Sequence, residues 1–323
     1  TANINTITDL DVGQKNIIDL TGIAGFTALQ TVRISNNQIL TVDFTSNSNL
    51  THIYATCGDL TSSNSTGLTN LEEVYLTFNN LTSLDVSSNT SLTKLECNAN
   101  DITNLNVNNS SLIDLVCSGN DLTTLDLSGT TALKILQING NQFAEIDLSN
   151  NTDLFFLNVI GNPIEALDLS NNALLETLYL NLSASNLTTI EHLDLSNNPL
   201  LKGLYAEYVT NLKTINLKNG NNTAITTFYV AGTPSLTCIE VDDATYSTNN
   251  WTSVDAHVSF NTDCNYPYTY VPDNNFEQAL IDLGYDSGVL DDYVLTANIS
   301  GITSLDISNK GIVDITGIED FSM

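Results

Sequence analysis

A period of 21 residues is the feature that most constrains this chain. Six apolar residues open similar phrases, such as "LECNANDI" and "LVCSGNDL", at spacings of 21, 20, 21, 21 and 21 positions. These residues are Val74, Leu95, Leu115, Leu136, Leu157 and Leu178. Self-similarity at a fixed short period is typical of repeat architectures, in which each repeat forms one structural unit. We call these positions and their counterparts along the chain the first ladder.

A second ladder lies half a period away, and its usual phrase is "LDLSNN". Its members are Leu84, Leu105, Leu125, Ile146, Leu167, Leu193 and Ile215. Each 21-residue coil therefore has two short strand-like segments with alternating apolar residues, and almost no room for a helix. One coil alone cannot bury its apolar face. We therefore expect stacked coils that share one continuous core, which is a mostly β solenoid.

The first-ladder phrase follows the pattern LxLxxNxL, which is the core pattern of a leucine-rich repeat. An asparagine recurs at one phase of this pattern, just after the first segment: Asn79, Asn100, Asn120, Asn141 and Asn162. An amide side chain both donates and accepts hydrogen bonds. We expect these asparagines to be buried and to satisfy backbone groups where each coil turns.

The chain also contains a long duplication. Residues 1–26 align with residues 296–321 without a gap, and 15 of the 26 positions are identical. The sequence therefore holds most of one large module, which is made of many 21-residue coils, and the opening of a second module. We expect the first unit to lack its opening cap.

Charge excludes some classes of partner. The chain of 323 residues has 37 acidic and 8 basic residues, a net charge of −29, and 41% of its residues are hydrophobic. This apolar content suffices for a large core. The negative surface repels nucleic acid and anionic lipid. No apolar run approaches the ~18 residues of a membrane span, so we expect no direct membrane insertion.

The motifs "LDLSNN" and LxCxxN resemble those of bacterial leucine-rich-repeat proteins with short nested 21-residue repeats, of the flavobacterial type. The resemblance implies secretion or display at a bacterial cell surface. It implies a solenoid over residues 1–241, a closing cap over 236–264, a linker over 265–272, and the opening cap and first coil of a second module over 273–323. The opening cap is expected to contain a short helix around Phe276–Leu283. Neighbouring modules of such an array would be partners of this one.

The five cysteines fall into three groups. Cys238 and Cys264 bracket the closing cap, so we expect a disulfide there, which implies an oxidising compartment. Cys97 and Cys117 occupy inward positions and are expected to be buried thiols, although their stacking would also permit a bridge. Cys57 lies in a turn and has no assigned role.

Outward positions of the first ladder carry an excess of tyrosine. In chain order they are Asp11, Arg33, Tyr54, Tyr75, Glu96, Val116, Gln137, Asn158, Tyr179, Tyr205 and Tyr229. Phe156 is expected to face the same way. Two interpretations remain open for Tyr54, Tyr75, Phe156, Tyr179, Tyr205 and Tyr229: the rings stabilise adjacent strands, or they form a surface for a protein or glycan ligand.

Aspartates recur at the matching position of the second ladder. Those in the middle coils, Asp126, Asp147 and Asp168, would stack about 4.8 Å apart and repel one another. Hydrogen bonds from the neighbouring serines and asparagines would offset this repulsion. Bound calcium is the alternative, because calcium prefers carboxylate oxygen ligands. No other cofactor is expected.

Catalysis needs unlike groups that converge on one point, whereas this sequence repeats the same groups along a line. We therefore expect no enzymatic activity. The sequence favours a binding or adhesion module of a tandem array, which contacts a protein or glycan through the first-ladder sheet. The alternative is a passive spacer in a large surface protein.

Overall fold

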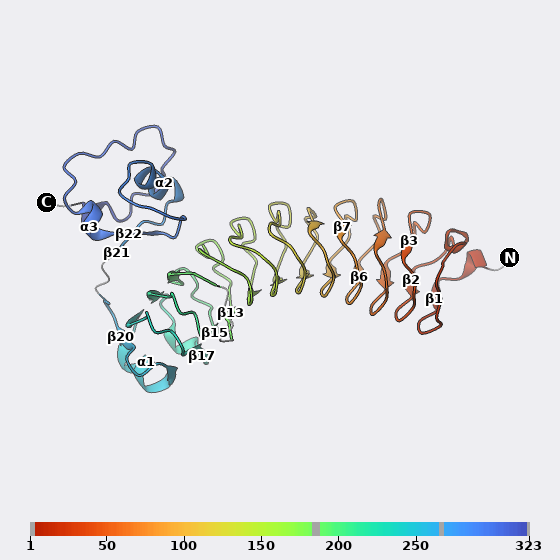
Figure 1. Cartoon of the computed structure of the whole chain (residues 1–323), viewed down its shortest axis with the longest axis horizontal. Coiled ribbons are helices and arrows are strands. Elements are labelled where there is room, and N and C mark those ends of the chain that lie inside the picture. The colour runs from red at the N-terminus through yellow and green to blue at the C-terminus, as the bar shows by residue number, and fades with distance from the viewer. Residues whose placement is uncertain (1–3, 183–187, 265–267, 322–323) are drawn as a thin grey trace.

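The computed structural model describes residues 4–182, 188–264 and 268–321, and it shows a curved solenoid followed by a small C-terminal unit (Figure 1). The solenoid consists of coils stacked along one curved axis. The described residues contain no helix that is long and apolar enough to cross a membrane.

The first ladder forms one parallel sheet of twelve strands. In order, the strands are β1 (Asp9–Asp11), β2 (Thr31–Arg33), β4 (His52–Tyr54), β6 (Glu73–Tyr75), β8 (Lys94–Glu96), β10 (Asp114–Val116), β11 (Ile135–Gln137), β12 (Phe156–Asn158), β13 (Thr177–Asn181), β15 (Gly203–Ala206), β17 (Thr227–Val230) and β19 (Ser253–Val254). Equivalent residues of adjacent coils pair, as Leu136 does with Leu157. The sheet lies on the inner side of the arc (Figure 1). We call it the first-ladder sheet.

The second ladder is interrupted. Two of its sheets have two strands each, β3–β5 and β7–β9, and one has four, β14–β16–β18–β20. The strands are β3 (Thr41–Asp43), β5 (Ser62–Asn64), β7 (Ser83–Asp85), β9 (Asn104–Asn106), β14 (His192–Asp194), β16 (Thr214–Leu217), β18 (Cys238–Val241) and β20 (Ser259–Asn261). Within the described residues, the segments around Leu125, Ile146 and Leu167 form no strand. The mostly β leucine-rich-repeat solenoid is confirmed, with its second face less regular than its first.

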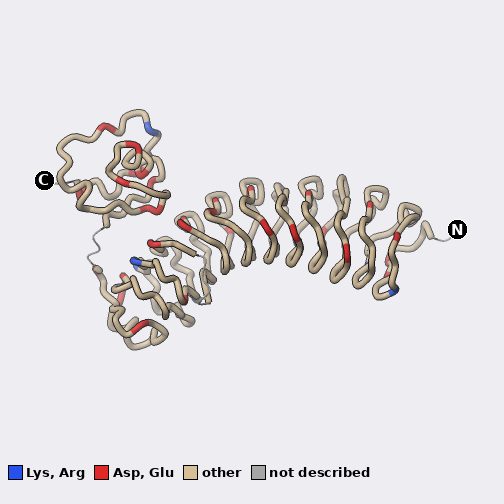
Figure 2. The backbone as a smooth tube through the Cα atoms, viewed as in Figure 1, with Lys and Arg blue, Asp and Glu red and all other residues tan. Residues whose placement is uncertain are grey.

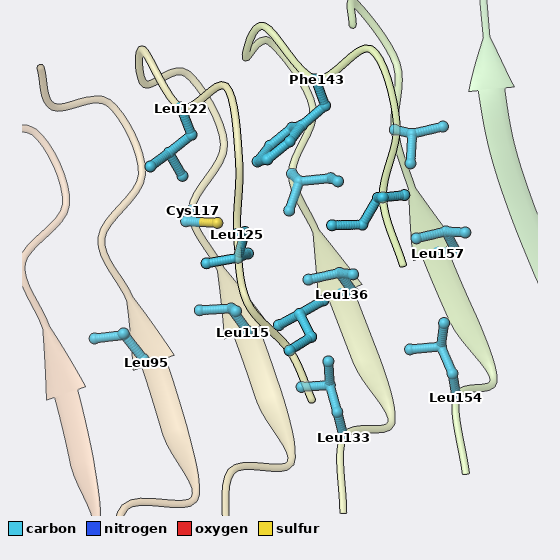
Figure 3. Packing of buried hydrophobic residues seen from close by; sticks show 14 of the residues in the cluster. Leu95, Leu115, Cys117, Leu122, Leu125, Leu133, Leu136, Phe143, Leu154 and Leu157 are labelled. Atoms are coloured by element: carbon cyan, nitrogen blue, oxygen red, sulfur yellow. The ribbon is translucent and has the colours of Figure 1, made fainter. Parts of the chain in front are cut away.

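The core follows the repeat. Leu95, Leu115, Leu136 and Leu157 are fully buried and point into the space between the two faces, one above another (Figure 3). Burying one such side chain stabilises the fold by about 1.5–3 kcal/mol. Because each coil buries its apolar residues against the next coil, the core is continuous from Ile23 to Trp251.

Buried asparagines close the turns as expected. Asn120 illustrates the arrangement: its Nδ2 donates to the carbonyls of Cys97 (3.1 Å) and Cys117 (2.9 Å), and its Oδ1 accepts from the Ile102 amide (3.0 Å). The side chain therefore joins three coil segments. A second set, not anticipated from the sequence, follows the second ladder: Asn89, Asn109, Asn151, Asn172, Asn198 and Asn219 donate to carbonyls of the preceding coil.

A cap closes the solenoid at its C-terminal end. Helix α1 (Ala244–Asn250) precedes Trp251, which stacks on Phe228 with ring centroids 4.4 Å apart. The predicted disulfide between Cys238 and Cys264 is confirmed, with 5.8 Å between the two Cα atoms. It ties the cap to β18.

The remaining cysteines are free. Cys97 and Cys117 are buried as predicted, and burial raises the pKa of the Cys117 thiol to about 12. Cys57 is exposed and adopts a φ of 55°. Gly119, Gly140 and Gly161 have similar positive φ values in later coils. Cys57 therefore occupies a left-handed turn position that glycine usually favours.

The C-terminal unit has its own small core around Phe276 and Leu280. It contains β21 (Tyr268–Tyr270), α2 (Asn274–Asp282), β22 (Tyr293–Leu295) and α3 (Thr296–Ile299). The expected helix is α2, and Asp273 caps it by accepting from the amides of Asn275 and Phe276 (both 2.9 Å).

Part of the segment predicted to be a linker belongs to this unit. Residues 265–267 lie outside the described part of the chain, but β21 pairs antiparallel with β22. Thr269 is almost fully buried there because its strand covers the small core. The division of the chain into domains at this segment stays a prediction.

The duplication is visible in the backbone. Gln14 and its counterpart Asn309 both have a φ of 57°. Gly22 and Gly317 also have positive φ values, 104° and 93°, and each precedes a short 3-10 helix. These helices are η2 (Ile23–Gly25) and η4 (Ile318–Asp320); the two others are η1 (Ile4–Thr6) and η3 (Asn222–Ala224).

Candidate functional site

The outward aromatic residues of the first-ladder sheet gather into two groups. Parallel pairing in register places Tyr54 beside Tyr75, and places Tyr179 beside Tyr205 and then Tyr229. Because equivalent positions of adjacent coils share one face, the sequence period alone brings these rings together. The structure thus assembles all six predicted residues into one N-terminal pair and one C-terminal row.

The C-terminal row contains four rings. Their centroids lie 5.6 Å apart for Phe156 and Tyr179, 4.1 Å for Tyr179 and Tyr205, and 5.5 Å for Tyr205 and Tyr229. Tyr179 and Tyr205 also share a side-chain hydrogen bond, which together with burial raises the pKa of the Tyr179 phenol. The Tyr179 phenol is therefore held in its neutral form.

The N-terminal pair is enclosed by charged residues. Tyr54 and Tyr75 stack with centroids 4.9 Å apart. The Arg33 guanidinium lies 5.1 Å from the Tyr54 ring, and the Lys94 ammonium lies 5.8 Å from the Tyr75 ring. Cations at such distances interact favourably with aromatic faces. Burial, helped by the hydrogen bond to Glu73, raises the pKa of Tyr75 to about 12.

Charge divides the first-ladder sheet into two halves. Outward positions from β1 to β10 include Asp9, Asp11, Arg33, Glu73, Lys94, Glu96 and Asp114. Outward positions from β11 to β19 carry no charged residue: they are Ile135, Gln137, Phe156, Asn158, Thr177, Tyr179, Gly203, Tyr205, Thr227, Tyr229 and Ser253. Acidic residues are frequent elsewhere along the chain (Figure 2). The neutral half is therefore exceptional in a chain with a net charge of −29.

Two charged residues beside that half neutralise each other. Glu176 and Lys202, which directly precede β13 and β15, form an ion pair at 2.6 Å. A neutral aromatic face of this kind can contact apolar and hydroxyl groups of a ligand, but it offers no counter-ion to a charged one.

The aspartates of the second ladder form hydrogen bonds with neighbouring residues of their own coil. Asp126 accepts from the Ser128 amide (3.0 Å), Asp147 from Ser149 (2.9 Å) and Asp168 from Ser170 (2.8 Å). These hydrogen bonds are the ones expected to offset the repulsion within the ladder. Across the described residues, no group of three or more His, Cys, Asp or Glu is arranged to hold a metal ion. The described residues therefore contain no such cluster for the calcium that the aspartate ladder could suggest.

The C-terminal unit packs on the second-ladder side of the solenoid, and sequence reasoning missed this contact. His192 of β14 lies against two tyrosines of that unit, with ring centroids 4.6 Å from Tyr268 and 4.7 Å from Tyr293. The Lys213 ammonium lies 5.7 Å from the Tyr268 ring. A pocket of about 710 Å³ beside this contact is lined by acidic residues of the solenoid, including Asp147 and Asp168, and by α2. We call the contact the junction.

Burial shifts the protonation of several junction groups. Burial, followed by the charges of Asp168 and Asp194, raises the pKa of Asp292 to about 8. Burial also lowers the pKa of His192 to about 4, with a further contribution from Lys213. His192 Nε2 lies 3.8 Å from an Asp291 oxygen, but because the imidazole is neutral near pH 7 the contact is not an ion pair there. Burial raises the pKa of both Glu277 and Asp291.

No protein-family model and no curated protein matches the chain. Solved structures do. The functional domain of InlJ from Listeria monocytogenes, described as including a cysteine ladder, is 26% identical with a TM-score of 0.46, over 75% of this chain and 70% of that one. YopM from Yersinia enterocolitica is 21% identical with a TM-score of 0.55, over 73% of this chain and 47% of that one.

An internalin C2 from Listeria monocytogenes is 22% identical with a TM-score of 0.43, over 54% of this chain and 80% of that one. The likeness to YopM shows the fold: the chain is a leucine-rich-repeat solenoid, and it spans about half the length of YopM. At this identity the fold alone is shared, and a fold does not fix a ligand. Resemblance to the flavobacterial type stays a prediction.

Proposed function

We propose that this chain is a non-enzymatic binding or adhesion module in a tandem array at a bacterial cell surface. Its ligand, a protein or glycan, contacts the aromatic row on the first-ladder sheet. One observation carries the proposal: Phe156, Tyr179, Tyr205 and Tyr229 form a continuous row of contacting rings on the uncharged half of the sheet. Aromatic anchors of this kind dominate the affinity of many interfaces.

The non-enzymatic part of the proposal rests on how polar groups are distributed. Catalysis needs a nucleophile, a base and a stabilising group at one point. The described histidines lie apart: His52 is on β4, His192 is in the junction and His257 follows β19. The two free buried cysteines, Cys97 and Cys117, lie in the apolar core of the solenoid.

An extracellular location is supported by the Cys238–Cys264 disulfide, because disulfides persist in oxidising compartments. The net charge of −29 agrees with a highly hydrated surface that repels nucleic acid. We infer a secreted or surface-displayed protein whose other partners include neighbouring modules of the same array.

A passive spacer is the second candidate, and one observation favours it. The aromatic rings contact one another, so each ring already has a structural role in joining adjacent strands. The contact of His192 with Tyr268 and Tyr293 would also help to hold successive units in a fixed orientation. A spacer requires no ligand at the aromatic row.

The two candidate functions predict different adhesion by a Tyr179→Ala, Tyr205→Ala double variant. Beads that display the chain are tested for adhesion to glycans and to cell surfaces. If the row binds a ligand, the double variant loses adhesion by roughly thirtyfold or more, because an anchor residue carries about 2 kcal/mol or more.

The matched control removes two aromatic rings outside the sheet. Phe78 and Tyr208 lie in turns and are 60% and 40% exposed. Phe78→Ala, Tyr208→Ala should adhere as the unchanged chain does. If the tyrosine variant remains folded and adheres equally well, the spacer replaces the binding module as the function of this chain.

A further inference from the structure

The aromatic row is open at one end. Tyr205 covers one face of the Tyr229 ring, with centroids 5.5 Å apart and planes at 27°. On the other side, the residue that pairs with Tyr229 is Ser253 of β19, which has no ring. Tyr229 is accordingly 42% exposed. The N-terminal pair differs, because cations lie over Tyr54 and Tyr75.

A pocket of about 390 Å³ lies at this open end. Its walls include Tyr229, Tyr246, Thr227, Asn250, Thr252 and Ser253. Its volume falls in the range of about 300–1,000 Å³ that is usual for small-molecule sites. None of its lining residues is charged. Among the described residues, the side-chain hydroxyls of Thr227, Thr252 and Ser253 have no protein partner and remain available to a ligand.

The base of the pocket is rigid. Trp251 stacks on Phe228 with planes at 15°, and its indole Nε1 donates to the Ile225 carbonyl at 3.3 Å. The Tyr246 ring meets Trp251 edge to face. Because these buried contacts fix the surrounding walls before any ligand arrives, binding would lose little free energy to ordering the protein.

We propose that this pocket binds one neutral sugar residue of a glycan, with the sugar stacked on the open face of Tyr229. The inference rests on the proposed function and names its ligand class. Three features select this chemistry. An aromatic face accepts the apolar face of a sugar ring. Hydroxyl and amide groups at the rim can both donate and accept hydrogen bonds. Because no lining residue is charged, the pocket offers no counter-ion to an acidic or basic group of a ligand.

A peptide ligand fits these features less well. Peptide backbones commonly bind by adding a strand to an exposed sheet edge. Here the pocket is lined by the outward residues Thr227, Tyr229 and Ser253 of β17 and β19, so it lies on the face of the sheet and not along the outer edge of β19. An acidic glycan is opposed by the net charge of −29. The test below includes both as competing outcomes.

The experiment fills the open end. Ser253→Tyr adds a ring where the sugar would stack, and tyrosine is favourable at a strand position beside another tyrosine. Tyr229→Ala removes the stacking face instead. The control is Ser83→Tyr, which adds the same ring at an exposed position of β7 on the other side of the solenoid. Circular dichroism and thermal unfolding establish that each variant is folded.

Binding of the whole chain is measured by calorimetry with neutral cello-, xylo- and manno-oligosaccharides, an acidic oligouronate, and an unrelated neutral peptide. We expect at least one neutral oligosaccharide to bind, with an affinity that salt does not change, because no ion pair forms. Ser253→Tyr and Tyr229→Ala should each weaken it by roughly tenfold or more. Ser83→Tyr should leave it unchanged.

Other outcomes overturn the inference. If all three variants bind neutral oligosaccharides equally, the pocket is not their site. If only the oligouronate or the peptide binds, the ligand class is wrong. If no oligosaccharide binds while adhesion still depends on Tyr179 and Tyr205, the sugar site fails and the proposed function stands. If adhesion does not depend on those tyrosines, the proposed function fails as well.

Discussion

Tyr179 and Tyr205 stack almost parallel, with ring centroids 4.1 Å apart and planes at 9°. The two residues are paired partners on β13 and β15. Gly203 contributes to this geometry, because a Cβ atom at that position would come within 3.3 Å of the Tyr205 ring. The repeat register therefore brings the two rings together, and the glycine leaves room beside them.

The first prediction concerns the stability that this stack provides. Tyr179→Ala with Tyr205→Ala should lower the free energy of unfolding by about 1–2 kcal/mol, since the rings lie outside the core and lose mainly pair interactions. Leu178→Ala on the inward side of the same strand should cost about 2–5 kcal/mol, because Leu178 is fully buried. Urea denaturation measures both. Equal losses would mean that the rings are part of the structural core.

The second prediction concerns the cap. Cys238→Ser with Cys264→Ser should lower the free energy of unfolding by roughly 3 kcal/mol, because the disulfide closes a loop across a sequence separation of 26 residues. Denaturation of the variant and of the unchanged oxidised protein gives the difference. Cys57→Ser serves as the control, since Cys57 is exposed and free. A loss as large in the control would assign the effect to serine substitution and not to the disulfide.

The third prediction concerns the asparagines that close the turns. Asn141→Ala should lower the free energy of unfolding by at least about 1–3 kcal/mol, because it leaves buried backbone groups without partners. Its Nδ2 donates to the carbonyls of Cys117 (3.1 Å) and Ile138 (2.9 Å), and its Oδ1 accepts from the Leu122 amide (3.1 Å).

Asn150→Ala is the matched control in the same coil. Asn150 is exposed, and within the described part of the chain its amide contacts only the Ser149 hydroxyl, at 3.3 Å. We expect a change of less than about 0.5 kcal/mol for this surface position. Thermal or urea unfolding of both variants compares a buried, hydrogen-bonded asparagine with an exposed one.

Sequence reasoning succeeded where one period governs the structure. The positions of Leu136, Asn141 and Tyr179 follow from counting residues, because a solenoid converts spacing along the chain into neighbourhood in space. The Cys238–Cys264 disulfide followed from the position of the two cysteines around the cap.

Features without that period could not be predicted. Ser253 pairs with Tyr229, although the cap that contains Ser253 departs from the repeat. His192 contacts Tyr268 and Tyr293 only because a separately folded unit packs back on the solenoid. No local pattern encodes such a contact, because it depends on the path of the intervening chain. The open pocket and the junction were therefore found only in the structure.

The junction leads to the last prediction, which concerns pH. Asp292 of the C-terminal unit is half-buried, faces Asp168 and Asp194 of the solenoid, and lies next to Asp291. Other groups around it are Glu277, Glu191, Tyr270, Lys213 and His192. Burial among these carboxylates raises the pKa of Asp292 to about 8, so the folded junction binds a proton that the unfolded chain releases.

A raised carboxyl pKa makes stability fall as pH rises, by at most about 1.4 kcal/mol per pH unit for one proton. The contribution of Asp292 is fully present below its unfolded pKa, near 4, and is lost as pH rises through about 8. His192 acts in the opposite direction, because its pKa is lowered to about 4 and its contribution is lost as pH falls from about 6.5. The window between about pH 6.5 and pH 9 therefore isolates the buried acids.

In that window, we expect the unfolding free energy of the C-terminal unit to decline with pH, as followed by its hydrogen exchange after correction for intrinsic rates. Asp292→Asn should flatten this decline and raise the stability at about pH 9, because an amide cannot ionise. Asparagine also tolerates the φ of 64° at this position. Asp153→Asn, an exposed change in the solenoid, is the control. A decline that persists unchanged in Asp292→Asn would assign the pH dependence to Glu277 or another group, and Asp292 would then be an ionised residue of a hydrated junction.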